Sequence, residues 1–138
     1  MTQTAINAEP RRKPCILLVE DDYAVRESLT RALASENYSV KPAASSEEAL
    51  RHFGTEVIDL AILDLNLGEN ASGWDLFESL STPANNRQQF PMVVMSARAD
   101  ALENKLAPQA RARLNKPLDI PSIMQSIDSW LDKRANLG

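Results

Sequence analysis

The sequence predicts an α/β fold in which helices cover both faces of one doubly wound, parallel, five-stranded sheet. Short and nearly continuous apolar runs alternate along the chain with segments whose apolar residues recur at helical spacing. Continuous apolar runs are typical of strands that are buried on both faces, as parallel sheets require. The chain has 138 residues, of which 43% are hydrophobic, so a single domain can bury a core without disulfides or metal staples.

The first half of the chain supplies three predicted strands and two predicted helices. Asp22 is placed to cap the first helix, and Pro42 indicates that the second strand lies at an edge of the sheet. Ser45 or Ser46 caps the second helix, and Gly54 is expected to end it. The predicted strands span 15–19, 38–43 and 57–63, and the predicted helices span 24–35 and 47–53. The solvent side of the first helix is expected to carry Arg26, Glu27 and Arg31.

The second half of the chain continues the same alternation. Strands are predicted over 91–95 and 111–114, and helices over 73–80, 99–106 and 120–134. The short helix between the last two strands stops before Pro108. Two helices carry apolar stripes at a spacing typical of core packing, formed by Trp74, Phe77 and Leu80 in one and by Ile123, Ile127, Trp130 and Leu131 in the other. We therefore expect a flexible leader over 1–14, a domain over 15–134 and a tail over 135–138.

Charge and composition argue against several classes of protein. The net charge of -4 and the pI near 5.0 give no electrostatic footprint for nucleic acid. Cys15 is the only cysteine, so there is no disulfide framework, and its apolar surroundings predict a buried thiol. No apolar stretch reaches transmembrane length, and the leader lacks the apolar core of a secretory signal. The sequence is thus expected to belong to a soluble, cytoplasmic protein.

Polar residues follow four of the predicted strands at the point where each one ends. Glu20 and Asp21 follow the first strand, Asp64 the third, Ser96 the fourth and Lys116 the fifth. With the first strand central in a doubly wound sheet, these side chains point into one crevice. Clustered carboxylates repel one another, and a hard divalent cation such as Mg²⁺ (or Mn²⁺) would neutralise them.

The same set of residues suits phosphoryl transfer to a carboxylate. Asp64 would be the nucleophile, while the metal and Lys116 balance charge on the phosphoryl oxygens and Ser96 donates a hydrogen bond to one of them. An isolated aspartate at a strand end can equally begin a turn or cap a helix. It is the grouping of these residues at successive strand ends that favours a site.

Four motifs carry a resemblance to a known family. The run Cys15-Ile-Leu-Leu-Val-Glu-Asp-Asp22, Leu63-Asp-Leu-Asn66, Met95-Ser-Ala97 and Asn115-Lys-Pro117 resemble the receiver domain of two-component response regulators. The resemblance covers roughly 15–134. It implies a flavodoxin-like (βα)5 fold with strand order 2-1-3-4-5.

The resemblance also implies roles for the site residues. Asp64 matches the phosphoacceptor and Asp21 the direct metal ligand. Glu20 matches the acidic partner that usually acts through water, and Asn66 the position whose backbone carbonyl completes the metal shell.

The remaining positions concern switching. Ser96 matches the switch hydroxyl, Lys116 the phosphate-binding lysine and Pro117 its typically cis proline. Asn66 and Arg98 match the two positions that tune hydrolysis of the aspartyl phosphate.

The function that this resemblance implies is signalling. The chain would be phosphorylated on Asp64 with Mg²⁺ by a sensor histidine kinase or a histidine phosphotransfer protein. A single-domain protein would then signal by phosphotransfer or by reversible binding to a downstream protein, as a monomer or a phosphorylation-dependent dimer. It would catalyse only its own phosphorylation and dephosphorylation, without nucleic-acid or membrane partners. His52, the only histidine, is expected at the surface and is a poor candidate for a phosphodonor.

Three departures from the family pattern affect the expected output. The loop after Asp64 lacks a Met-Pro pair and reaches Gly73 one residue late. Residues 109–110 are Gln-Ala instead of Gly-Ala, and the fourth helix is short. Arg113 replaces the usual switch aromatic and should stay at the surface, because burying an unpaired guanidinium is costly. Activation should therefore be read in the loops over 65–73 and 97–100.

Three other classes of protein fit the sequence less well. A haloacid-dehalogenase-like phosphatase carries an acid two residues after its nucleophile, where this chain has Asn66. A pseudo-receiver that only binds partners would normally lack one of the acids or the lysine. A nucleotide-binding flavodoxin-like domain needs a glycine-rich phosphate loop, which 68–73 does not provide.

Overall fold

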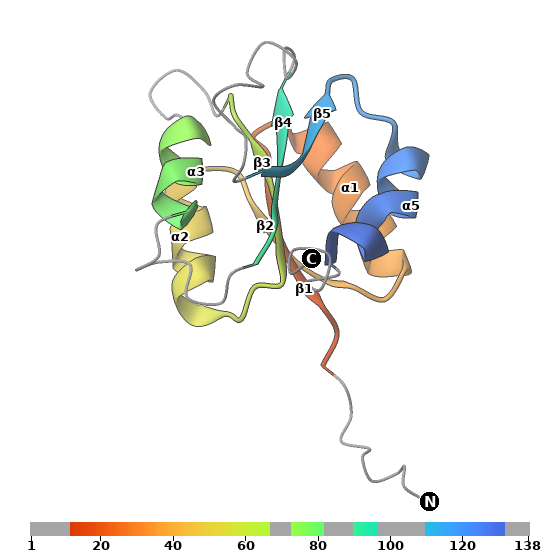
Figure 1. Cartoon of the computed structure of the whole chain (residues 1–138), viewed down its shortest axis with the longest axis horizontal. Coiled ribbons are helices and arrows are strands. Elements are labelled where there is room, and N and C mark those ends of the chain that lie inside the picture. The colour runs from red at the N-terminus through yellow and green to blue at the C-terminus, as the bar shows by residue number, and fades with distance from the viewer. Residues whose placement is uncertain (1–11, 67–72, 82–89, 97–109, 132–138) are drawn as a thin grey trace, which may run out of the picture.

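The computed structural model describes residues 12–66, 73–81, 90–96 and 110–131, except for the side chains of Trp74 and Ser81. Five parallel strands form one sheet in the order β2-β1-β3-β4-β5, which confirms the predicted topology (Figure 1). The strands are β1 (Cys15–Val19), β2 (Ser39–Ala43), β3 (Leu60–Asp64), β4 (Met92–Ser96) and β5 (Ala110–Asn115). The helices are α1 (Tyr23–Ser35), α2 (Ser46–Thr55), α3 (Gly73–Ser81) and α5 (Ile120–Leu131). The helix predicted over 99–106 lies outside the described residues.

The sheet separates two hydrophobic cores. Helices α2 and α3 cover one face and α1 and α5 the other (Figure 1). Successive residues of a strand point to opposite faces, so Leu17 packs in the core under α2 and α3, while Leu18 packs in the core under α1 and α5. Each fully buried leucine contributes about 1.5–3 kcal/mol to folding. Cys15 is buried, as predicted.

The helix caps agree with the sequence at the amino ends. Asp22 caps α1, with its Oδ1 accepting from the backbone N of Val25 at 3.0 Å. Of the two serines considered for α2, Ser45 is the cap and its hydroxyl accepts from the N–H of Glu48 at 3.2 Å. The expectation that Gly54 ends α2 is wrong, because the helix continues to Thr55. Gly54 occupies an ordinary helical position in open space, with no left-handed turn that would require a glycine.

The predicted start of the third strand is also wrong. The strand was expected from residue 57, but β3 begins at Leu60 and Val57 is 50% exposed. Asp59 makes hydrogen bonds instead, accepting from the N–H of Cys15 at 2.7 Å and from the guanidinium of Arg12 at 2.9 and 3.1 Å. These bonds join the start of β1 to the segment before β3.

His52 is half-buried, which differs from the expectation of a surface residue. Its Nε2 lies 3.1 Å from the carbonyl oxygen of Pro42 in the edge strand β2. A carbonyl oxygen only accepts, so this nitrogen carries the proton. Among the described residues, no helix combines the length and the apolar character needed to cross a membrane.

Candidate functional site

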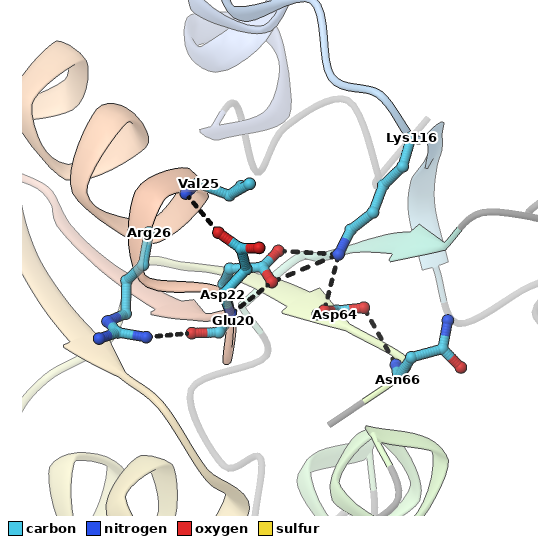
Figure 2. A network of polar contacts seen from close by, with 7 residues as sticks. All are labelled: Glu20, Asp22, Val25, Arg26, Asp64, Asn66 and Lys116. Carbon is cyan, nitrogen blue, oxygen red and sulfur yellow. Dashed lines mark hydrogen bonds and ion pairs between the residues drawn. The ribbon is translucent and has the colours of Figure 1, made fainter. Parts of the chain in front are cut away.

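The site lies at the carboxyl edge of the sheet, where the ends of β1, β3 and β5 meet (Figure 2). Glu20 follows β1, Asp64 is the last residue of β3 and Lys116 follows β5. Asp64 and Glu20 are both fully buried, whereas Asp21 is exposed. The structure thus brings together the acids and the lysine that the sequence placed at successive strand ends.

Lys116 joins the two buried carboxylates. Its Nζ lies 2.8 Å from Asp64 Oδ2 and 3.0 and 3.3 Å from the two carboxylate oxygens of Glu20. Burial alone would lower the pKa of Lys116, but hydrogen bonds to Asp64 and Glu20 outweigh burial and raise it. The lysine therefore keeps its charge throughout the neutral pH range.

The pKa of Glu20 departs strongly from its ordinary value. Burial raises the pKa of Glu20 to about 7, with a further contribution from the nearby Asp64 carboxylate. Hydrogen bonds from the backbone N–H of Asp22 and from Lys116 act in the opposite direction. One ammonium group is not enough to neutralise this crowded set of acids.

The acids fit a divalent cation. One carboxylate oxygen from each of Glu20, Asp21 and Asp64 lies within 4.8 Å of the other two. Glu20 Oε1 is buried and accepts no hydrogen bond, although Lys116 Nζ lies at ion-pair distance. Even with Glu20 partly protonated near neutral pH, the three acids carry more negative charge than one lysine offsets. Hard oxygen ligands with that excess charge suit Mg²⁺ or Mn²⁺.

The backbone around Asp64 is fixed on several sides. Asp64 Oδ1 accepts from the N–H of Asn66 at 3.0 Å, and the N–H of Leu65 donates to the carbonyl of Met95 at 2.9 Å. Gly73, the first residue of α3, lies directly over this segment. A Cβ atom there would lie 2.2 Å from the Asp64 carbonyl oxygen and 2.5 Å from the Leu65 Cα atom. Only glycine allows α3 to begin so close to Asp64.

The sequence predicts Gly73 as the first residue of a helix but gives no sign of its close approach to Asp64, and it predicts Arg26 on the solvent side of its helix. That placement is wrong, because Arg26 is half-buried and its Nη1 donates to the carbonyl of Glu20 at 2.8 Å (Figure 2). The available signal was weak: Arg26 lies four residues after the cap Asp22, so it faces the same end of the sheet. Neither contact can be read from residue type alone.

The residues predicted to take part in switching differ in how deeply they are buried. Ser96, the last residue of β4, is buried, and its carbonyl accepts from the N–H of Lys116 at 3.1 Å. The Lys116–Pro117 peptide bond is cis. Arg113 is exposed on β5, as expected from the cost of burying it. Arg98 and most of the loops over 65–73 and 97–100 lie outside the described residues.

Comparison with known proteins gives consistent matches over most of the chain. The model of the response regulator receiver domain family matches residues 16–128. The transcriptional regulatory protein GlrR of Escherichia coli K12 is 33% identical over 122 residues, which make up 87% of this chain but 27% of GlrR. This chain thus spans little more than a quarter of that relative's length.

Solved structures resemble the whole fold. A CheY-like receiver domain protein from Methanospirillum hungatei JF-1 has a TM-score of 0.77 and 28% identity, covering 92% of this chain and 100% of that one. A response regulator from Burkholderia pseudomallei has a TM-score of 0.71 and 25% identity, covering 90% of this chain and 69% of that one. The latter was solved with a phosphorylated aspartic acid, a calcium ion and citrate.

Proposed function

Because this chain belongs to the response-regulator receiver family of two-component signalling, we propose that Asp64 is its phosphoacceptor and that the reaction depends on Mg²⁺ or Mn²⁺. One observation carries the proposal: Asp64 is a buried carboxylate at a strand end, 2.8 Å from Lys116 Nζ and grouped with two further acids. The Burkholderia pseudomallei relative, which was solved with a phosphorylated aspartic acid and a divalent ion, supports it.

The phosphodonor is proposed to be the phosphohistidine of a sensor histidine kinase or of a histidine phosphotransfer protein. A carboxylate oxygen of Asp64 forms a bond to phosphorus while the bond from phosphorus to the imidazole nitrogen breaks, and the electron pair leaves with the imidazole. Lys116 balances negative charge on the phosphoryl oxygens, and the Ser96 hydroxyl donates to one of them.

The metal is proposed to be held by carboxylates at the ends of β1 and β3. Asp21 and Asp64 would bind it directly, Glu20 through water, and Asn66 through its backbone carbonyl. When bound, the cation supplies positive charge that offsets the developing charge of the phosphoryl group. The chain would act as its own substrate, catalysing only its phosphorylation and dephosphorylation.

The partners beyond the phosphodonor are a further part of the proposal. The resemblance to the receiver portion of regulators such as GlrR suggests that phosphorylation changes binding to another protein or to another part of a regulator. The acidic net charge of -4 supports an output without direct contact between this domain and nucleic acid. The alternatives to this output are transfer of the phosphoryl group from Asp64 to another protein and reversible association of the chain, including dimerisation.

The test is phosphorylation by acetyl phosphate in the presence of Mg²⁺, followed by intact-protein mass spectrometry. We expect one added phosphoryl group in the wild type and none in Asp64→Asn. Asp75→Asn is the matched control, because Asp75 is an exposed aspartate in the first turn of α3 and lies outside the site. Equal labelling of wild type and Asp64→Asn would exclude Asp64 as the phosphoacceptor.

A further inference from the structure

The turn between β1 and α1 is fixed by hydrogen bonds on both sides of Asp21. On one side, the backbone N–H of Asp22 donates to Glu20 Oε2 at 3.0 Å. On the other, Arg26 Nη1 donates to the backbone carbonyl of Glu20 at 2.8 Å (Figure 2). The Asp22 side chain is occupied in capping α1 through Val25. The two peptide groups that flank Asp21 are therefore both held.

Asp21 depends on this turn more than the other acids do. Glu20 and Asp64 are buried and paired with Lys116, but Asp21 is exposed. Within the part of the chain that the structure describes, the Asp21 carboxylate has no hydrogen bond or ion pair of its own. Its place within 4.8 Å of the other two carboxylate oxygens is consequently set by its backbone.

Arg26 is well suited to hold that backbone. It is half-buried, and its guanidinium carbon lies 5.6 Å from the centroid of the Tyr23 ring, a cation–π distance that restricts the side chain. Among the described carboxylates, none forms an ion pair with Arg26. Its charge-assisted hydrogen bond to the Glu20 carbonyl is the polar contact that joins it to the described residues of the site.

We propose that Arg26 is a positioning residue of the metal site. By donating a hydrogen bond to the Glu20 carbonyl, it keeps the Asp21 carboxylate in place to ligate the cation. This inference rests on the proposed function. It makes a prediction whose sign is opposite to that of simple electrostatics. Removing a positive charge next to an acidic site should strengthen binding of a divalent cation if charge alone mattered. Loss of positioning should weaken it.

The experiment is a titration with Mn²⁺, in which the free ion is measured by electron paramagnetic resonance. We expect Arg26→Gln to raise the Kd about tenfold, the lower end of the effect of removing a group that orients a metal ligand. Arg26→Lys keeps the charge but is shorter and lacks the planar fork, and should raise the Kd about threefold. The matched control is Arg31→Gln, on the same helix, with an 81% exposed side chain that pairs only loosely with Glu27 at 3.6 Å. Its Kd should stay within about twofold of the wild type.

A second measurement needs no metal. Amide hydrogen exchange at Asp22 in the metal-free protein should be faster in Arg26→Gln than in Arg31→Gln. The reason is that the turn loses one of the two hydrogen bonds that flank Asp21, the one from Arg26 to the Glu20 carbonyl. A folded Arg26→Gln protein whose Kd is unchanged or lower would overturn the inference. If Arg26→Gln does not fold, a wild-type Kd in Arg26→Lys would overturn it instead.

A failure of the proposed function would look different. In that case the wild type would bind no Mn²⁺, or Asp21→Asn would bind it as well as the wild type does, and the metal site itself would be wrong. Asp22→Asn should have little effect on the Kd for Mn²⁺, because asparagine still caps the helix.

Discussion

At the scale of single residues, Lys116 is the cation that pairs with both buried acids of the site, Glu20 and Asp64. It lies 52 residues from Asp64 in sequence and contacts both buried carboxylates with a side chain that is itself only 25% exposed. A buried ion pair adds little net stability, but removal of one partner leaves the other charge buried and uncompensated. Here the removal of one cation would leave Asp64 as such a charge, next to Glu20, whose pKa of about 7 already lets it bind a proton near neutral pH.

We therefore predict that Lys116→Met destabilises the metal-free protein by about 3–5 kcal/mol at neutral pH. Urea unfolding followed by circular dichroism measures this change. Addition of Mg²⁺ should restore part of the loss, because a cation at the same carboxylates replaces the missing charge.

The double variant Lys116→Met/Asp64→Asn serves as the control. It should be more stable than Lys116→Met alone, since one of the unpaired charges has been removed. If Lys116→Met were as stable as the wild type without Mg²⁺, the description of Lys116 as the neutralising partner of Glu20 and Asp64 would be wrong.

At the scale of elements, the site depends on how closely α3 begins to the end of β3. A methyl group on Gly73 would overlap the backbone of Asp64 and Leu65, which cannot move without disturbing β3. We predict that Gly73→Ala destabilises the fold by about 1–3 kcal/mol and lowers the rate of phosphorylation by acetyl phosphate. Thermal unfolding and the mass-spectrometric labelling assay report the two effects.

Gly54→Ala is the matched control for this prediction. A Cβ atom on Gly54 meets nothing within 4 Å, and the residue lies inside α2. Alanine is the better helix former by about 0.5–1 kcal/mol, so this variant should be slightly more stable than the wild type and should be labelled normally. Equal effects of the two alanines would contradict the close approach of α3 to Asp64.

The same elements show what the sequence could and could not predict. The order of strands and helices followed from apolar periodicity, and the acids and the lysine of the site followed from strand ends. The start of β3 was misplaced because Asp59 pairs with Arg12, 47 residues away. Arg26 was misplaced because its partner is a backbone carbonyl, which no residue type signals. Contacts of this kind depend on tertiary packing and leave no periodic pattern in the sequence.

One tertiary contact between elements has a measurable pH dependence. The hydroxyl of Tyr38, next to β2, donates to Asp128 of α5 at 2.7 Å. Burial, assisted by this hydrogen bond, raises the pKa of Tyr38 from 10.0 to about 12. The unfolded chain then loses its proton at a lower pH than the folded chain does. The stability that Tyr38 contributes is complete below pH 10 and is lost as the pH rises from 10 to 12.

We predict that Tyr38→Phe removes this part of the alkaline loss of stability, measured by urea unfolding between neutral pH and pH 12. The chain has two tyrosines, and the other one, Tyr23, is 68% exposed. A Tyr23→Phe protein therefore isolates the ultraviolet absorbance of Tyr38 for direct titration. An ordinary titration near pH 10 in that protein would contradict the hydrogen bond from Tyr38 to Asp128.

At the scale of the whole molecule, the two ends of the parallel strands carry different sets of polar contacts. The carboxyl edge gathers Glu20, Asp64 and Lys116. At the amino edge, the Asp59 carboxylate accepts hydrogen bonds from the Arg12 guanidinium and from the backbone N–H of Cys15. Two close-packed cores on either side of the sheet connect these edges, so a change at the site can reach distant surfaces only through elements with two stable arrangements.

The last prediction concerns which element responds when the site is occupied. Beryllofluoride with Mg²⁺ mimics an aspartyl phosphate, and hydrogen exchange reports the response along the chain. Arg113 is exposed on β5, and an inward movement would bury an unpaired guanidinium at a cost of several kcal/mol. We therefore expect greater protection around Glu20, Asp64 and Asn66, where the mimic adds contacts, and little change over Ala110–Asn115. The control is Asp64→Asn with the same additives, which should show no protection anywhere. Selective changes across Ala110–Asn115, with residues 64–66 unaffected, would instead identify β5 as the responding element and Arg113 as part of the switch.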